Sequence, residues 1–97
     1  MSPRIKKKIK IRNPQGLHAR PASIFVKIAN KYSAEVAVKK GRETVNGKSI
    51  MGLMMLAANE GTTITIEING SDAAQAMEEL AKFLNRTEES GGTEGLV

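Results

Sequence analysis

The chain contains a single histidine, His18, which lies between a glycine-containing turn and the expected start of a helix. A neutral imidazole nitrogen is a competent nucleophile toward phosphorus. The free N–H groups of a first helical turn, together with the positive end of the helix dipole, form a site for an anion. The guanidinium of Arg20 can bind two phosphoryl oxygens at once. These residue types fit phosphoryl acceptance by His18, although a histidine at a helix start also serves as a cap or as a plain surface residue.

The helix that would position His18 is indicated by apolar residues at helical spacing. Its buried face is expected to consist of Ala22, Phe25, Val26 and Ala29. Proline fits only the first turn of a helix, where its missing N–H is not needed, and Pro21 therefore sets the start close to Ala19. His18 is then expected at the N-terminal end of this helix.

The other elements follow from alternating or helical patterns of apolar residues. Strands are expected over residues 5–11, 35–40, 43–46 and 62–69. A short helix is expected over residues 50–56 with Ser49 as N-cap, and a last helix begins after Ser71 or Asp72. The lysines of the first strand suit a sheet edge. The order βαββαβα predicts an α+β fold, an open-faced β-sandwich with three helices on one face of a four-stranded, mainly antiparallel sheet.

Composition excludes several classes of protein. With no cysteine in its 97 residues, the chain has no disulfides, no thiolate metal site and no thiol catalysis, and neither a metal nor a cofactor is expected. No apolar run approaches the roughly 20 residues that span a bilayer, and the basic N-terminus does not form a signal peptide. We therefore expect a cytoplasmic protein without membrane insertion. The net charge of +5 is concentrated in the first half of the chain, which suits acidic partners, phosphate or nucleic acid.

Two segments resemble a known family. The sequence GLHARPA at residues 16–22 resembles the active-site motif of the HPr family, the phosphocarriers of the bacterial phosphoenolpyruvate–sugar phosphotransferase system. The sequence GKSIMGLM at residues 47–54 resembles the regulatory serine region of that family. The resemblance covers roughly residues 5–85, and we expect one HPr-like domain over residues 1–87 and a monomer. The Glu, Ser, Gly and Thr composition of residues 88–97 lies outside the resemblance and predicts a flexible C-terminal tail.

The resemblance also implies a role for each residue around the histidine. His18 would be phosphorylated on its Nδ1 atom by Enzyme I, which draws the group from phosphoenolpyruvate, and would pass it to the A component of a sugar permease. Arg20 would neutralise the group in transit, and the backbone amides of Ala19 and Arg20 would help to hold it. The protein would then be a stoichiometric carrier and not an enzyme with its own turnover.

The second segment implies regulation and docking. Ser49 would be phosphorylated by a bifunctional HPr kinase/phosphorylase, and the added charge would disturb the docking of acidic partners. Lys27 and Lys48 would add electrostatic steering. In the family pattern, the docking residues correspond to Ser23, Ile24, Lys27, Lys48, Ile50, Met51 and Met54. The short helix over residues 50–56 has more apolar residues than one face can bury, so Leu53 and Leu56 are expected in the core and others are expected to be exposed. With Ile24 and Ile28, the exposed ones would surround His18.

Three alternatives stay open at this point. The same chemistry could serve a regulatory nitrogen-type phosphorelay, although the serine region argues mildly against this. A small basic nucleic-acid-binding module would need aromatic residues for base stacking, and the chain has only 3% aromatics. A regulatory relative unable to carry phosphate would lack the histidine, so His18 argues against that class.

Overall fold

The computed structural model describes residues 3–85 of the chain. Its seven elements are β1 (Arg4–Lys10), α1 (Ala19–Ala29), β2 (Glu35–Lys40), β3 (Glu43–Asn46), α2 (Ile50–Met55), β4 (Thr63–Asn69) and α3 (Ala73–Leu84). The predicted order βαββαβα is confirmed. The flexible tail predicted over residues 88–97, and the end of the predicted domain at residues 86–87, lie outside the described residues.

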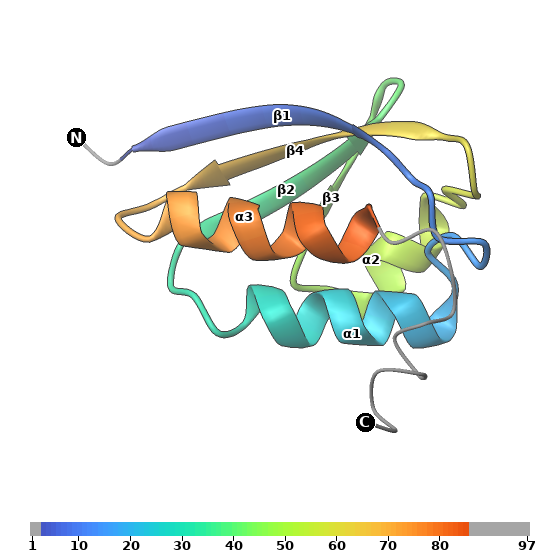
Figure 1. Ribbon diagram of the computed structural model, residues 1–97, viewed down its shortest axis with the longest axis horizontal. Coiled ribbons are helices and arrows are strands. Elements are labelled where there is room, and N and C mark those ends of the chain that lie inside the picture. Colours follow the sequence, from blue (N-terminus) through green and yellow to red (C-terminus); the bar gives the residue numbers. More distant parts are fainter. Residues whose placement is uncertain (1–2, 86–97) are drawn as a thin grey trace.

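The four strands form one sheet in the order β1-β4-β2-β3, and every pairing among residues 3–85 is antiparallel. The three helices lie on one side of this sheet and leave its other side bare (Figure 1). The predicted open-faced sandwich is therefore confirmed. The prediction that the lysine-rich first strand lies at an edge is confirmed as well, because β1 pairs with β4 alone.

The core lies between the sheet and the helices. In strand β4 every second side chain points toward the helices, and these residues, Ile64, Ile66 and Ile68, are fully buried. Each such side chain contributes about 1.5–3 kcal/mol when it is removed from water. The helices supply the opposite wall with residues from their predicted faces, including Phe25 of α1 and Leu80 of α3.

The start of α3 differs from its prediction in one respect. Asp72 occupies the N-cap position, but its carboxylate makes no hydrogen bond to its own helix. Its backbone (φ −103°, ψ 24°) is not in the extended conformation that lets an N-cap side chain turn back. The carboxylate instead accepts hydrogen bonds from the N–H groups of Ser33 at 2.9 Å and Ala34 at 3.0 Å. Asp72 thus joins the loop after α1 to the start of α3.

This contact predicts an acid-sensitive contribution to stability. The hydrogen bond from the Ser33 backbone lowers the pKa of Asp72. The ionised carboxylate therefore stabilises the fold above the unfolded-state pKa of about 3.9, and this contribution is lost as the pH falls through the lower folded-state pKa. Asp72→Asn should lower the urea midpoint at neutral pH, and its difference from the wild type should shrink in acid. Urea unfolding at both pH values measures this, and an equal difference at both would contradict it.

Candidate functional site

His18 is the N-cap residue of α1, so the predicted start of that helix at Ala19 is confirmed. Its backbone is extended, with φ −87° and ψ −170°. Its side chain is exposed and makes no hydrogen bond to any residue from 3 to 85. The imidazole is therefore open to approach by another molecule.

The turn before His18 is closed by the side chain of Asn13. The Asn13 Nδ2 atom donates to the carbonyl of Gly16 at 2.8 Å, and its Oδ1 accepts from the N–H of Gln15 at 3.3 Å. The Gly16 N–H donates in turn to the Asn13 carbonyl at 3.0 Å. Asparagine favours such turns because its side chain can replace a backbone partner. These bonds fix the chain immediately before the histidine.

A second loop holds the other side of this turn. The N–H of Leu17 donates to the carbonyl of Ala58 at 2.9 Å, and the Leu17 side chain is buried. Gly16 has a positive φ of 64°, and a Cβ there would lie 2.7 Å from the Ala58 carbonyl oxygen and 2.8 Å from Asn59 Cα. Only glycine permits so close an approach. The position of His18 therefore depends on the segment that follows α2.

That segment is itself held by Lys40, a residue for which the sequence predicted only a place in a strand. The Lys40 Nζ atom donates to the carbonyls of Leu56 at 2.9 Å and Ala57 at 3.3 Å, at the end of α2. Ala57 has the left-handed backbone, φ 53°, that an alanine rarely adopts. Lys40 thus satisfies carbonyl groups that the helix end leaves without intrahelical partners, directly before Ala58 contacts the turn of His18.

The first turn of α1 offers donors for an anion. The Ala22 N–H is bonded to the His18 carbonyl at 2.8 Å, and Pro21 has no N–H. The N–H groups of Ala19 and Arg20 make no hydrogen bond to the described part of the chain. The Arg20 side chain is exposed and forms no ion pair within residues 3–85. Two backbone donors and one guanidinium, all within one helical turn of the imidazole, are thus available to an anionic group.

Ser49 is the N-cap of α2, as predicted. Its Oγ accepts a hydrogen bond from the N–H of Gly52 at 3.0 Å, and its backbone is extended. The prediction that Leu53 and Leu56 belong to the core is also confirmed, because both are buried. The Ser49 hydroxyl is only half-buried, so the cap is accessible from outside.

Helices α1 and α2 pack together and share an apolar surface. Within residues 3–85, the large hydrophobic side chains that are exposed all belong to these two helices. We call this set the α1–α2 surface: Ile24, Ile50, Met51, Met54 and Met55. Methionine side chains are flexible and polarizable, so such a surface can adapt to different partners.

The structure shows where the residues in and around the predicted docking set lie. Met55 was not among the predicted docking residues, but it is 72% exposed; its only signal was the excess of apolar residues in a short helix. Ile28, expected beside His18 with Ile24, is half-buried and packs against the core. The Lys48 Nζ atom donates to the carbonyl of Tyr32 at 2.7 Å, so this ammonium is bound to the loop after α1. Lys27 is exposed on α1, and Ser23 is half-buried.

Residues 3–85 contain neither a cluster that could bind a metal nor a helix that could span a membrane. No group of three or more His, Asp or Glu side chains in residues 3–85 is arranged to hold a metal ion. None of the three helices has the length and apolar character that crossing a membrane requires.

Comparison with known proteins gives consistent matches. Residues 5–86 match the family model described as the PTS HPr component phosphorylation site. The phosphocarrier protein HPr of Neisseria meningitidis serogroup A is 49% identical over 81 residues, covering 84% of this chain and 91% of the relative. The HPr-like protein Crh of Halalkalibacterium halodurans is 43% identical over 82 residues, covering 84% and 98%. The crystal structure of a phosphocarrier protein HPr from Bacillus anthracis has a TM-score of 0.82 at 44% identity, covering 84% and 98%.

Proposed function

Because the chain belongs to the HPr family of phosphotransferase-system phosphocarriers, we propose that His18 is the residue that carries the phosphoryl group. One observation carries the assignment. The chain's single imidazole is exposed at the N-cap of α1, next to two backbone N–H groups and the Arg20 guanidinium, which have no partners among residues 3–85. A phosphoryl group on this histidine would meet donors from the same helical turn.

In the proposed reaction, Nδ1 of His18 attacks the phosphorus atom carried by Enzyme I. The N–P bond forms while the bond between phosphorus and its leaving group on Enzyme I breaks. Charge on the transferred group is stabilised by the Arg20 guanidinium and by the amides of Ala19 and Arg20. The group then passes from His18 to the A component of a sugar permease, and the free imidazole returns. The chain thus alternates between a phosphorylated and a free form, as a stoichiometric carrier in the cytoplasm. A monomer suffices, because His18, Arg20 and the two amides belong to one chain.

A reconstituted relay tests this function. Labelled phosphoenolpyruvate, Enzyme I, the full chain and the A component of a sugar permease are mixed, and each component is then omitted in turn. The proposal predicts that label reaches the A component only when the chain is present. A parallel mixture contains the A component of a nitrogen-type relay in place of the sugar component. Label that stays on Enzyme I, or that reaches the nitrogen-type component and not the sugar component, would contradict the sugar-uptake role.

We also propose that phosphorylation of Ser49 regulates docking. Ser49 directly precedes Ile50 and Met51, which belong to the α1–α2 surface, and its hydroxyl is half-buried. Phosphate added there would place negative charge at the border of the α1–α2 surface, where it would oppose the docking of partners that are acidic. The bifunctional HPr kinase/phosphorylase is the proposed modifying enzyme.

The charge effect can be separated from the capping effect by two substitutions. Ser49→Asp keeps an N-cap acceptor and adds a charge, whereas Ser49→Asn keeps an acceptor without a charge. We expect Ser49→Asp to bind Enzyme I about tenfold more weakly than Ser49→Asn, because like charges oppose each other at the interface. Calorimetric titration of both variants measures this. Equal affinities would count against regulation by charge.

A further inference from the structure

The bare face of the sheet carries a row of lysines that the proposed function does not use. In β1, Ile5 and Ile9 point toward the core, and Lys6, Lys8 and Lys10 alternate with them on the opposite side. The register places Lys8 beside Thr65 of β4, and Thr65 in turn beside Lys39 of β2. Basic side chains therefore lie on this face in two strands, β1 and β2, with β4 between them.

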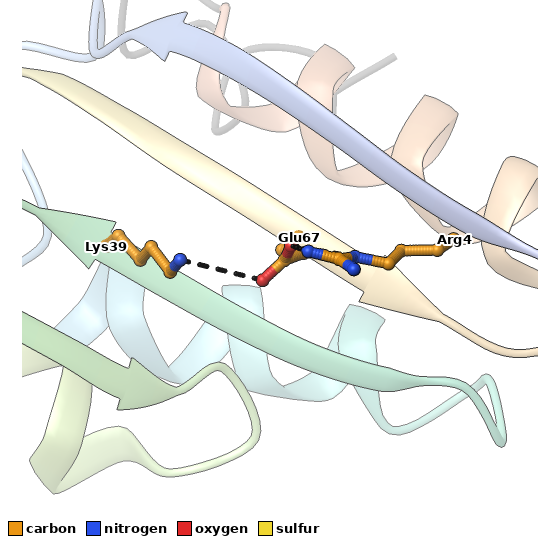
Figure 2. Close-up of polar contacts among 3 residues, drawn as sticks. All are labelled: Arg4, Lys39 and Glu67. Atoms are coloured by element: carbon orange, nitrogen blue, oxygen red, sulfur yellow. Dashed lines mark hydrogen bonds and ion pairs between the residues drawn. The ribbon is translucent and has the colours of Figure 1, made fainter.

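The carboxylate in the middle of this face is already neutralised. Figure 2 shows Glu67 of β4 between Arg4 and Lys39, on the side of the sheet that faces away from the helices. The Arg4 Nε atom donates to Glu67 Oε2 at 2.9 Å, and Lys39 Nζ lies 3.7 Å from Oε1. Lys8 and Lys10 form no ion pair with any residue from 3 to 85. The face consequently presents excess positive charge to its surroundings.

Protection of a sheet edge does not account for this pattern. Edge lysines discourage strand pairing at the outer strand, but Lys39 lies on β2, which has a strand on each side. The neighbours of Lys8 and Lys10 on β4 are Thr65 and Thr63, and not carboxylates that would balance the charge. The face also carries the carboxylates of Glu67 and Glu35, but its basic residues Arg4, Lys6, Lys8, Lys10 and Lys39 outnumber them. A net positive surface of this kind suits an anionic partner.

The composition of the bare face argues against nucleic acid and against insertion of apolar side chains. The chain's aromatic residues are Phe25, Tyr32 and Phe83, which belong to α1, the loop after it and α3. Bases of a nucleic acid would therefore find no stacking platform on the bare face. The exposed large hydrophobic side chains of residues 3–85 all lie on α1 and α2. Binding at the bare face must then be electrostatic and must not require insertion of apolar side chains.

We propose that the bare face of the sheet binds the surface of a bilayer that contains anionic phospholipids. Lys6, Lys8, Lys10 and Lys39 would lie against the headgroups. His18 and the α1–α2 surface belong to the helical layer on the other side of the sheet (Figure 1), so a protein could dock there while the sheet faces the bilayer. This inference does not depend on the proposed phosphoryl transfer.

Vesicle sedimentation with the full chain tests the proposal. We expect binding to vesicles of phosphatidylglycerol and phosphatidylcholine at low salt, no binding to phosphatidylcholine alone, and release at high salt. Each lysine near an anionic surface changes the partition coefficient about fivefold, so the double variant Lys8→Gln/Lys10→Gln should bind about 25-fold more weakly. A matched control is Lys27→Gln/Lys82→Gln, which removes the same charge from two exposed residues of the helical layer that form no ion pair within residues 3–85.

The outcomes separate the face from the overall charge. Loss of vesicle binding in the sheet variant, with little change in the helical-layer variant, supports the proposal. An equal loss in both variants would show that net charge alone attracts the protein, and would overturn it. Failure to bind anionic vesicles at low salt would overturn it too, as would displacement from the vesicles by a single-stranded oligonucleotide that binds the same lysines more tightly.

Discussion

Replacing His18 with alanine should abolish phosphoryl acceptance completely while leaving the protein folded. His18 is the only histidine of the chain, so no second imidazole can take its place. Its side chain is exposed and makes no hydrogen bond within residues 3–85, and its removal should change the free energy of unfolding by no more than about 0.5 kcal/mol. The rate of label transfer from phosphorylated Enzyme I measures the loss.

The His18 variant also needs a test of docking. The α1–α2 surface is untouched by the substitution, so His18→Ala should still bind Enzyme I and should compete with the wild type. A variant that binds but does not accept phosphate would assign the loss to chemistry. Acceptance by His18→Ala at a rate near that of the wild type would contradict the assignment of the nucleophile.

Arg20→Ala should slow transfer on the order of 100-fold without unfolding the domain. The Arg20 guanidinium has no partner among residues 3–85, so its removal breaks no contact there. The variant loses the guanidinium, whose positive charge and paired N–H groups can bind two phosphoryl oxygens. Stopped-flow measurement of transfer from Enzyme I gives the rate constant.

Two further substitutions show whether the effect belongs to this position. Arg20→Lys keeps the charge but loses the paired donors, so its rate should lie between those of Arg20→Ala and the wild type. Arg42→Ala removes the same side chain from the exposed turn between β2 and β3, and should leave the rate unchanged. Equal slowing by Arg20→Ala and Arg42→Ala would show that the site needs only net positive charge.

Local patterns in the sequence predict the elements of this fold well. The alternation in β4 and the helical spacing in α1 each describe one buried face, because burial repeats with the geometry of the element. Pro21 and Ser49 mark helix starts for reasons that concern only their own first turns. The site depends on the start of α1 beside His18, and that start could be predicted because it is set by residues of its own first turn.

Contacts between distant segments could not be predicted in the same way. Asp72 binds the N–H groups of the loop after α1, and Lys40 binds the carbonyls at the end of α2. Lys48, predicted to steer partners, donates to the Tyr32 carbonyl. In each case a polar side chain reaches a backbone group that only the tertiary fold brings near it. Hydrophobic periodicity carries no information about such pairs.

The bare face shows the same division between local and distant information. The alternation of lysine and isoleucine in β1 predicts that the lysines share one face. That these lysines share a face with Lys39, and that Glu67 pairs with Arg4, follows only from the order β1-β4-β2 in the sheet. The sequence therefore predicts a charged strand, whereas the sheet order reveals a charged surface.

Locating the phosphoryl group on the protein tests the role of His18 most directly. The full chain is incubated with phosphoenolpyruvate and Enzyme I from the same organism, and the product is analysed by intact and fragment mass spectrometry before and after brief acid treatment. We predict one phosphoryl group, attached to His18 and lost in acid, because a phosphoramidate is acid-labile. An unmodified but folded chain, or an acid-stable group on another residue such as Ser49, would contradict it.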